Sequence, residues 1–395
     1  MGLEFYYTVI LIIGLIVWWF LENSRHKKNL KKVQYRIHVN GTRGKSSVTR
    51  LIAGIFREAG YKTIAKTTGS TPRIIFPDGH EEPIQRRGGA NIREQVKILN
   101  LAANMGVEVA VLECMALQPQ YQEITEKKMI KANAAVLTNT RPDHLDVMGP
   151  TPEDVVDALS GMIPENGLLF TSERENLKKL QANALKLGAE VLSSQDIIID
   201  AKEIDRFSHI EHHDNVALSL KVANHFGIDR EIAMRGMLKA KPDPGALMLY
   251  HMPSNNKDIV FANAFAANDP ESNKLVWNII NNRFEKEKRF IILNNRADRQ
   301  TRTIQLAEFV SHIEADHFFL IGTGTDILKG LLKKNGIGSM KFTDFSNRTC
   351  PEIFKEIEKK TENKSVVIGM GNIGGIGHDV IKYCEASLDH TKKGG

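Results

Sequence analysis

The sequence predicts an α/β fold with two parallel-sheet domains and an N-terminal membrane helix. Three observations support this prediction: apolar strand-like runs alternate with helix-like stretches, a glycine-rich loop follows the first such run, and an uncharged apolar segment precedes it. Strands that alternate with helices are typical of parallel sheets, because parallel strands need a crossover connection. We expect a membrane segment over 1–32, a loop-bearing parallel-sheet domain over 33–245, and a smaller α/β domain over 246–395.

The segment from Phe5 to Leu21 has no charged residue, and two tryptophans, Trp18 and Trp19, lie near its end. This is at the short end for a spanning helix, and tryptophans are typical of membrane interfaces. A cleaved signal peptide is the alternative, but its charges would precede the apolar run. Here the charges follow, so the positive-inside rule predicts a single-pass cell-membrane protein with a cytoplasmic body. The basic flank comprises Arg25, His26, Lys27, Lys28, Lys31 and Lys32.

The composition is that of a globular protein without a nucleic-acid surface. The net charge is +6, and residues 1–36 hold six Lys or Arg against two Glu, so most of the excess lies beside the apolar segment. The expected partners therefore include a membrane and exclude nucleic acid. The three cysteines are widely spaced and form no metal or disulfide pattern, which fits a reducing compartment. They are Cys114, Cys350 and Cys384.

A phosphate loop follows the first predicted strand, Tyr35 to Val39, and opens a helix from about Ser46 to Ala59. Backbone N–H groups of such a turn, with the positive end of the helix, cradle phosphate. Lys45 would reach the β- and γ-phosphates, and the Ser46 hydroxyl would bind Mg²⁺. The alternative is a solvated glycine turn with a stray lysine. The loop residues are Gly41, Thr42, Arg43, Gly44, Lys45, Ser46 and Ser47.

Polar residues follow three further predicted strands, at 62–66, 107–112 and 134–138. In open α/β sheets, ligands bind at the carboxyl ends of the strands. Mg²⁺ prefers hard oxygen ligands, so Glu113 is a metal candidate and His144 marks a second metal position. The alternatives are an ordinary polar loop after the first strand, a surface acid after the second and a polar turn after the third.

The remaining elements continue the same alternation. Residues 74–93 are predicted as loop, and Asp214 is a plausible N-cap for a helix that ends near Phe226. Further elements of this domain are helices at 92–104, 152–162 and 231–238 and a strand at 167–171. Two prolines and a glycine within 241–245 mark the domain boundary. Beyond it we expect strands at 259–263, 290–293, 317–321 and 364–368, with helices at 272–282, 304–313 and from 325.

The stretch Gly369–Gly374 has the dinucleotide pattern G-x-G-x-x-G. No βα unit with an acidic ribose partner follows it, so we interpret it as a tight turn that packs a terminal helix.

Taken in order, these motifs resemble those of the Mur ligases and folylpolyglutamate synthetase, whose ATP loop is G-T-x-G-K-[ST]. The resemblance covers residues 35 to about 380. Its other parts are Ser70–Arg73 for T-S-P-H, Glu113 for the strand-end glutamate, Asp143–Asp146 for D-H-L-D, Asp214–Ala217 for the adenine-side region, and Asn263–Pro270 for an altered D-x-A-H-N-P.

Within this superfamily the chain most resembles the ligase subunit of poly-γ-glutamate synthase, a membrane-anchored capsule enzyme. The shared stretches are N-G-x-R-G-K-S, E-C-M-A, D-H-x-D-V-M-G-P-T, P-D-P-G-A, F-A-A-N-D and N-x-R-A-D-R.

The resemblance implies a P-loop ATPase domain, a smaller Rossmann-like domain, and ATP- and Mg²⁺-dependent γ-amide formation through an acyl phosphate. Its implied partners are glutamate, the growing poly-γ-glutamate chain, small integral-membrane subunits of the synthase and a possible second copy of the chain. The implied catalytic residues are Lys45, Glu113 and His144. The implied nucleotide contacts are Gly41 to Ser47, Asn215 and Asn263; the metal ligands are Ser46, Thr71, Glu113 and His144; the substrate contacts are Arg73, Arg296 and Arg299.

Three positions depart from the family pattern. Leu159 stands near the family's carbamylated lysine, Ala246 stands where a phosphate-binding arginine is usual, and Asn263 replaces the ribose-side aspartate. No sugar-nucleotide domain precedes the loop, which argues against a peptidoglycan precursor as substrate.

Other functions stay open at this point. The chain could be a P-loop ATPase that drives a membrane partner, although a second βα domain suits a ligase better. A folate glutamylase would need an aromatic-lined pocket, whereas aromatic residues make up only 7% of the chain. A purely structural anchor would not need Lys45, Glu113 and His144 at strand ends.

Overall fold

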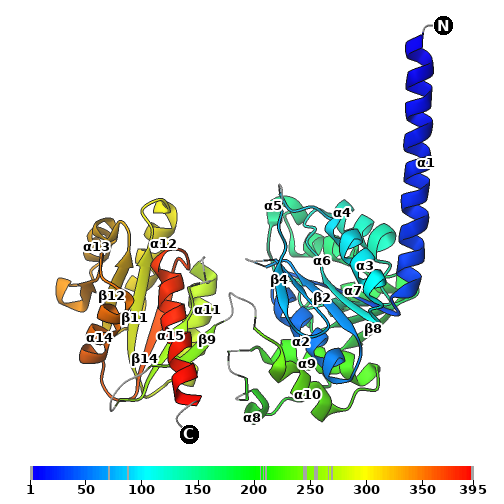
Figure 1. Ribbon diagram of the computed structural model, residues 1–395. Coiled ribbons are helices and arrows are strands. Elements are labelled where there is room, and N and C mark those ends of the chain that lie inside the picture. The colour runs from blue at the N-terminus through cyan, green and yellow to red at the C-terminus, as the bar shows by residue number, and fades with distance from the viewer. Residues whose placement is uncertain are drawn as a thin grey trace. The chain divides into compact units, whose positions relative to one another are not determined.

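The computed structural model contains two compact units (Figure 1). Unit 1 comprises Met1–Phe207 and Glu211–Pro244, and unit 2 comprises Ser208–Ile210 and Gly245–Gly395. The structure describes residues 3–69, 72–86, 89–204, 206–207, 209, 211–242, 247–252, 257–265, 267 and 270–392, with side chains from residue 5 to residue 386.

Unit 1 is built on an eight-stranded sheet of order β4-β3-β2-β5-β1-β6-β7-β8. The six strands from β2 to β8 in this order are parallel, and β3 and β4 extend the β2 edge antiparallel. The strands are β1 Tyr35–Asn40, β2 Thr63–Thr67, β3 Arg73–Ile75, β4 Glu81–Pro83, β5 Val109–Glu113, β6 Ala134–Leu137, β7 Leu168–Thr171 and β8 Glu190–Ser193.

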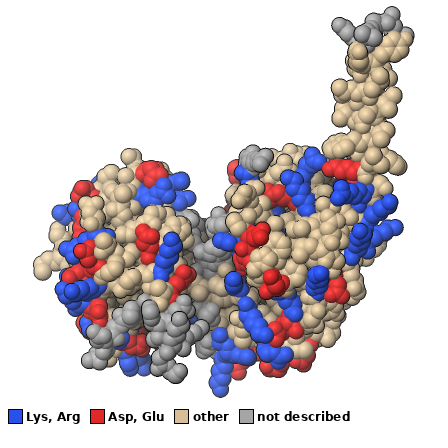
Figure 2. All heavy atoms as spheres, viewed as in Figure 1, with Lys and Arg blue, Asp and Glu red and all other residues tan. Residues whose placement is uncertain are grey.

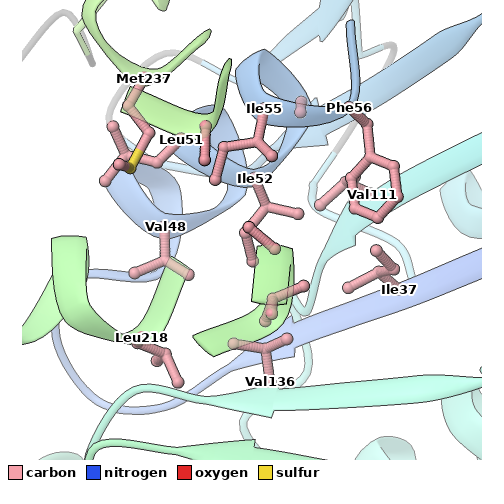
Figure 3. Close-up of a cluster of buried hydrophobic side chains, with 14 of the residues drawn as sticks. Ile37, Val48, Leu51, Ile52, Ile55, Phe56, Val111, Val136, Leu218 and Met237 are labelled. Carbon is pink, nitrogen blue, oxygen red and sulfur yellow. The ribbon is translucent and has the colours of Figure 1, made fainter. Parts of the chain in front are cut away.

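Helices cover both faces of this sheet. Alternate residues of β1, β5 and β6 pack against α2, α9 and α10 on one face (Figure 3), and the intervening residues of β5 and β6 pack against α3, α6 and α7 on the other. The helices are α1 Leu3–Lys32, α2 Lys45–Glu58, α3 Glu94–Met105, α4 Pro119–Ile124, the π-helical turn η1 Thr125–Ile130, α5 Leu145–Met148, α6 Pro152–Ser160, α7 Leu177–Lys186, α8 Ala201–Ile204, α9 His213–His225 and α10 Arg230–Lys239.

The two halves of α1 have different surroundings. The apolar side chains of its N-terminal half are exposed, and the helix is long and apolar enough over Phe5–Lys32 to cross a membrane. Its C-terminal half belongs to unit 1: Leu30 is buried, His26 Nε2 donates to the Met129 carbonyl at 2.8 Å, and Asn29 donates to Asn100 at 3.0 Å.

Unit 2 is built on a six-stranded sheet of order β13-β12-β11-β14-β10-β9, in which only β9 is antiparallel. Two apolar clusters fill its two faces. Its strands are β9 Met248–His251, β10 Ile259–Asn263, β11 Lys288–Asn295, β12 His317–Gly322, β13 Phe342–Asp344 and β14 Ser365–Gly371, and its helices are α11 Pro270–Arg283, α12 Gln300–Ser311, α13 Thr325–Lys334, the 3₁₀ turn η2 Ser339–Lys341, α14 Cys350–Lys360 and α15 Ile376–Lys392.

The predicted α/β class is confirmed, and two local predictions are wrong. The expected loop at 74–93 contains most of the β3–β4 hairpin, whose strands of three residues are too short to show an apolar alternation. Asp214 is not the N-cap of α9, because the cap is His212. The Asp214 carboxylate instead accepts a hydrogen bond from Arg174 Nη2 at 2.9 Å.

Candidate active site

The phosphate loop connects the central strand β1 to α2, and two glycines set its path. Gly41 has φ +132° and Gly44 has φ +82°, values that L side chains rarely adopt. A Cβ on Gly41 would lie 2.0 Å from Thr138 Oγ1, and one on Gly44 would lie 2.7 Å from Asn215 Oδ1. Both positions therefore require glycine, and Asn215 lies directly against the start of α2.

The residues after β6 hold the loop from one side. Asn139 Oδ1 accepts a hydrogen bond from the Thr42 hydroxyl at 2.6 Å and one from the Arg43 N–H at 3.3 Å. The Thr138 hydroxyl donates to the Arg43 carbonyl at 2.6 Å. The loop shape is thus imposed by residues nearly a hundred positions away, and sequence reasoning missed Asn139, whose one signal was its place at a strand end.

A series of side-chain amide hydrogen bonds holds the start of the loop. The Gly41 N–H donates to Asn40 Oδ1 at 2.8 Å, Asn40 Nδ2 donates to Gln122 Oε1 at 2.7 Å, and Gln122 Nε2 donates to the Leu117 carbonyl at 3.0 Å. Because all three side-chain amide contacts are directional, Gln122 fixes the orientation of the Asn40–Gly41 peptide.

A buried ion pair lies on β1 two residues before Asn40. His38 Nδ1 is 2.8 Å from Glu126 Oε2, and both side chains are almost fully buried. Burial disfavours the imidazolium form, but the neighbouring Cys114 and Glu126 side chains outweigh it and raise the pKa of His38 to about 9. His38 is therefore charged at neutral pH.

Lys45 and Arg43 supply the loop's cations. Lys45 Nζ donates to the carbonyls of Gly41 at 2.6 Å and Thr42 at 3.3 Å, so its ammonium lies over the loop. Arg43 is half exposed, with Nη2 4.0 Å from Asp143 Oδ1. Both cations therefore lie at the loop, Lys45 over its carbonyls and Arg43 towards Asp143.

Glu113 is the last residue of β5, and its carboxylate contacts residues that follow β1 and β2. Its Oε2 accepts hydrogen bonds from Ser46 Oγ at 2.9 Å and Thr68 N–H at 2.7 Å, and its Oε1 accepts one from Thr68 Oγ1 at 2.6 Å. Glu113 as a whole is 2% exposed. Sequence reasoning placed Thr71 beside Glu113; Thr71 lies outside the described residues, and the hydroxyl found there is that of Thr68.

The oxygens of Ser46 and Glu113 suit Mg²⁺. They are hard ligands in direct contact, and a metal bound between them needs few other protein groups because Mg²⁺ keeps waters and phosphate oxygens. Within the described residues, no group of three or more His, Cys, Asp or Glu side chains is arranged to hold a metal. The donor set therefore fits a metal held jointly with a nucleotide.

Lys66 is a buried cation that sequence reasoning missed. Its side chain is fully buried, its Nζ is 3.5 Å from Glu94 Oε2, and burial lowers its pKa. Glu94 also accepts hydrogen bonds from Arg86 at 2.7 and 3.1 Å. The neighbouring Gln95 donates to the Glu113 carbonyl at 2.9 Å, so this network braces the Glu113 strand end.

His144 lies in the loop after β6, as the N-cap of α5. It has φ +45°, its imidazole is half exposed, and its Nε2 is 3.9 Å from Asp143 Oδ1. Leu159, near the expected carbamylated-lysine position, is fully buried in an apolar cluster with Val155 and Val156. No anionic ligand can come from that position.

Two further predicted site residues, Asn215 and Arg73, form contacts within unit 1. Asn215 Nδ2 donates to Glu211 at 2.8 Å, and Arg73 Nε lies 3.9 Å from Glu81 in the β3–β4 hairpin. Asn215 and Arg73 therefore both belong to unit 1.

Three predicted residues lie in unit 2. Asn263 ends β10 and accepts a hydrogen bond from the Phe265 N–H at 3.3 Å. Arg296 and Arg299 flank Asp298, at 2.8 and 3.8 Å. The Ala246 position lies outside the described residues.

Comparison with known proteins places these features in a family. A family described as "Mur ligase middle domain" matches residues 39–236, and one described as "Poly-gamma-glutamate synthase CapB C-terminal domain" matches residues 249–387. The chain is 38% identical over 383 residues to a capsule biosynthesis protein CapB of Bacillus anthracis, covering 94% of this chain and 82% of that protein. It is 38% identical over 379 residues to a PGA synthase CapB of Bacillus subtilis (strain 168), covering 95% of each.

Solved structures share the fold at low identity. A folylpolyglutamate synthase from Thermotoga maritima has a TM-score of 0.67 at 16% identity and covers 95% of this chain and 97% of its own. A bifunctional folylpolyglutamate synthase/dihydrofolate synthase from Yersinia pestis, complexed with AMPPNP and Mn ion, has a TM-score of 0.62 at 14% identity and covers 91% of both chains. These likenesses show the fold alone.

Proposed function

This chain belongs to the CapB family of poly-γ-glutamate synthases, and on that premise we infer that it is an ATP-dependent ligase that polymerises glutamate through γ-amide bonds. The observation that carries the inference is the contact of Ser46 and Thr68 with Glu113 beside Lys45, because it joins the phosphate loop to a carboxylate at the ligand-binding edge of the sheet. The γ-phosphoryl group of ATP would transfer to the terminal carboxylate of the chain. The amine of an incoming glutamate would then attack the acyl phosphate, forming the amide and releasing phosphate.

The residues of unit 1 take distinct roles in this reaction. Lys45 would neutralise charge on the transferred phosphoryl group, since phosphoryl transfer depends on positioning and charge stabilisation. Ser46 and Glu113 would hold Mg²⁺, with Thr71 as a further ligand and His144 at a second metal position. When bound, Mg²⁺ would neutralise phosphate charge and align the β- and γ-phosphates with the acceptor. The other contacts to nucleotide would come from Gly41 to Ser47, Asn215 and Asn263.

Arginines would hold the acidic substrates. We assign Arg73, Arg296 and Arg299 to carboxylates of glutamate or of the growing chain, because guanidinium groups bind carboxylates bidentately. Arg296 and Arg299 both contact Asp298, so part of their charge is already neutralised. Arg73 shares Glu81 with Arg50, which leaves a net positive charge in that group.

We further propose that α1 anchors the enzyme in the cell membrane with its body in the cytoplasm. Exposed apolar side chains fill its N-terminal half, and its basic residues follow on the side of unit 1. On this proposal, 1–32 form the anchor, 33–245 the ATP-binding domain and 246–395 the second ligase domain. The proposed partners are small integral-membrane subunits and a second copy of the chain. Protease added to intact cells should leave the body uncut.

The function is tested by incubating membranes that contain the full chain with ATP, Mg²⁺ and labelled glutamate. Glutamate-dependent release of ADP and a labelled polymer on a sizing gel are expected. ADP release that is the same without glutamate would identify an ATPase that drives a partner, and labelling of an added folate would identify a folate glutamylase.

A further inference from the structure

Four exposed apolar side chains lie beyond the carboxyl ends of β5 and β6. Tyr121 and Ile124 are three residues apart on α4 and therefore share one face of that helix, while Leu117 precedes α4 and Leu145 begins α5. Each of the four is between 39% and 43% exposed. We call them the edge residues, because the carboxyl edge of the unit 1 sheet also carries the phosphate loop and Glu113.

The direction of α1 follows from its contacts with α3. Glu22 Oε1 lies 3.1 Å from Arg93 Nη2, and Asn29 Nδ2 donates to Asn100 Oδ1 at 3.0 Å. Both pairs are separated by 71 positions in the sequence, so the two helices run in the same direction. The helix α3 leads into the parallel strand β5 and runs against it, as crossover helices do. The exposed N-terminal half of α1 therefore projects on the side of the carboxyl edge of unit 1 (Figure 1).

The same contacts give the height of the carboxyl edge along α1. Gln95, two positions after Arg93, donates to the Glu113 carbonyl at 2.9 Å. The strand end that carries Glu113 therefore lies level with the start of α3 and, through Arg93, with Glu22. Glu22 is the first charged residue after the apolar segment 5–21. The proposed metal site is thus held beside the point at which α1 would leave a membrane.

The edge residues reach further towards the membrane. The helix α4 continues directly into η1, and because this run connects the parallel strands β5 and β6, it also points along α1. The contact of His26 Nε2 with the Met129 carbonyl at 2.8 Å sets the register between them. Counting back from it at about 1.5 Å per residue puts Ile124, about 7 Å away, level with the end of the apolar segment. Tyr121, about 12 Å away, comes level with Trp18, and both residue types are enriched at membrane interfaces.

The apolar segment is short enough to draw this edge onto a bilayer. Its 17 residues, Phe5 to Leu21, span about 25 Å as a helix, whereas the hydrocarbon core of a bilayer is about 30 Å thick. Figure 2 shows an uncharged surface along the projecting part of α1 and Lys and Arg side chains where the helix meets unit 1. The exposed basic residues of α1 begin at Arg25, which suits the headgroup layer.

We propose that the edge residues insert into the interface of an anionic bilayer and that α1 is a rigid strut that holds the carboxyl edge of unit 1 against it. The inference rests on the proposed membrane anchor. A bilayer is the occupant that α1 itself brings to this height, and apolar side chains beside basic ones suit its headgroup–acyl boundary. The phosphate loop and Glu113 would then work at the membrane surface, so the polymer would be made there rather than in bulk solution.

The test measures lipid contact by the full chain in vesicles of phosphatidylcholine and phosphatidylglycerol. Ile124→Cys carries an environment-sensitive fluorophore in a Cys350→Ser background, because Cys114 and Cys384 are buried and Cys350 is not. Lipids with brominated acyl chains should quench this label by about twofold and shift its emission to the blue, since interfacial side chains lie at the headgroup–acyl boundary. A label that is not quenched would overturn the proposal.

The matched control is Leu185→Cys in the same background. Leu185 is 79% exposed in the last turn of α7. Because α7 connects the parallel strands β7 and β8, its end lies at the amino edge of the sheet, away from the proposed bilayer. This label should not be quenched, and equal quenching at both positions would indicate nonspecific adsorption and overturn the proposal. Both variants should keep the wild-type melting temperature, because both side chains are exposed.

A spacer in α1 tests the strut. An insert of about seven helix-forming residues between Leu21 and Glu22 adds two turns and would lift unit 1 by about 10 Å. The label at Ile124→Cys should then lose its quenching while the chain still floats with the vesicles. Quenching that persists would show that α1 does not set the height of unit 1 and would overturn the rigid placement.

Flotation separates this inference from the proposed function. If the wild-type chain floats with the vesicles but Ile124→Cys is not quenched, the edge does not dock, and the anchor and the ligase assignment both stand. If the wild-type chain does not float, the anchor fails and this inference fails with it, while glutamate-dependent release of ADP still decides the ligase assignment.

Discussion

Two glycine-rich turns, one in each unit, have similar spacing but different surroundings. The loop of unit 1 contains Gly41 and Gly44, and the turn of unit 2 starts at Gly371, the last residue of β14, and contains Gly374; β14 extends beyond the predicted strand end, so Gly369 lies within the strand. Both follow a central parallel strand and precede a helix. Glycine spacing alone therefore cannot separate a phosphate site from a packing turn.

The difference lies in what approaches each turn. In unit 2 a Cβ on Gly369 would lie 2.7 Å from the Phe265 ring, and Asn294 Nδ2 donates to the Gly374 carbonyl at 3.1 Å and to that of Asn372. The turn is filled by the unit's own side chains. In unit 1 protein groups also accept hydrogen bonds from the N–H groups of Gly41, Thr42 and Arg43. The unit 1 loop differs in that Lys45 follows it directly, whereas residues 371–375 of the unit 2 turn contain no lysine or arginine.

The largest expected effect follows from removing the loop cation. Lys45→Ala should lower glutamate-dependent ADP release by about a thousandfold, because a fixed positive charge on the phosphoryl group is lost. Its melting temperature should change little, since the Lys45 ammonium contacts only loop carbonyls.

The matched control is Lys329→Ala in unit 2, near the start of α13. Its ammonium binds Asp326 and Asp344, and no phosphate loop adjoins it. This variant should keep most of the activity. Equal losses in both variants would show that the loss of activity does not depend on the position of the cation in the phosphate loop.

The second effect concerns the metal. Glu113→Gln should lower activity by about a hundredfold and weaken the tight phase of the Mg²⁺ dependence, because Mg²⁺ prefers anionic oxygen. His144→Ala should remove a weaker second phase and spare the tight one, since Leu159 supplies no anionic ligand there. Activity measured against Mg²⁺ concentration at fixed ATP checks both. One phase, unaltered in His144→Ala, would return His144 to an ordinary turn residue.

A third effect contrasts the glycines themselves. Gly44→Ala should raise the KM for ATP by about tenfold, because an alanine at φ +82° is strained and its Cβ would press on Asn215. Gly371→Ala in unit 2 should instead lower the melting temperature and leave the KM for ATP unaltered, because its Cβ would meet the Asn294 carbonyl at 2.5 Å. Kinetics and thermal unfolding on both variants measure this, and a raised KM in Gly371→Ala would show that the turn also serves the nucleotide.

The smallest expected effect is opposite pH dependence of the two units. The pKa of His38 is raised to about 9, so its contribution to stability is complete below pH 6.5 and disappears as pH rises through 9. Burial, with Lys360 and Lys341 nearby, lowers the pKa of His317 in unit 2 to about 4, so its contribution is present above pH 6.5 and is lost towards pH 4.

Urea unfolding at pH 5, 7 and 9.5, repeated with His38→Gln and His317→Gln, measures these contributions. His38→Gln should remove part of the alkaline loss only, and His317→Gln part of the acid loss only. The same residual pH dependence in both variants would contradict the assignment.

The predicted elements agree best where strands are buried and apolar. The strand at β11 and the helix that becomes α2 lie within a few residues of their predicted positions, because apolar periodicity reports burial directly. The β3–β4 hairpin and the π-helical turn η1 were missed, since strands of three residues and one extra helical residue leave no periodic signal.

The sequence by itself determined which chemical groups stand at the strand ends. Lys45 and Ser46 follow β1 and Glu113 ends β5, and because parallel strands share one carboxyl edge, their position at the ligand-binding edge followed from local pattern alone. Only the tertiary structure decided which of these groups touch. Glu113 meets Ser46 and Thr68 because β5 lies between β1 and β2, and this strand order arises from packing of the whole sheet against helices on both faces, which no local window of sequence contains.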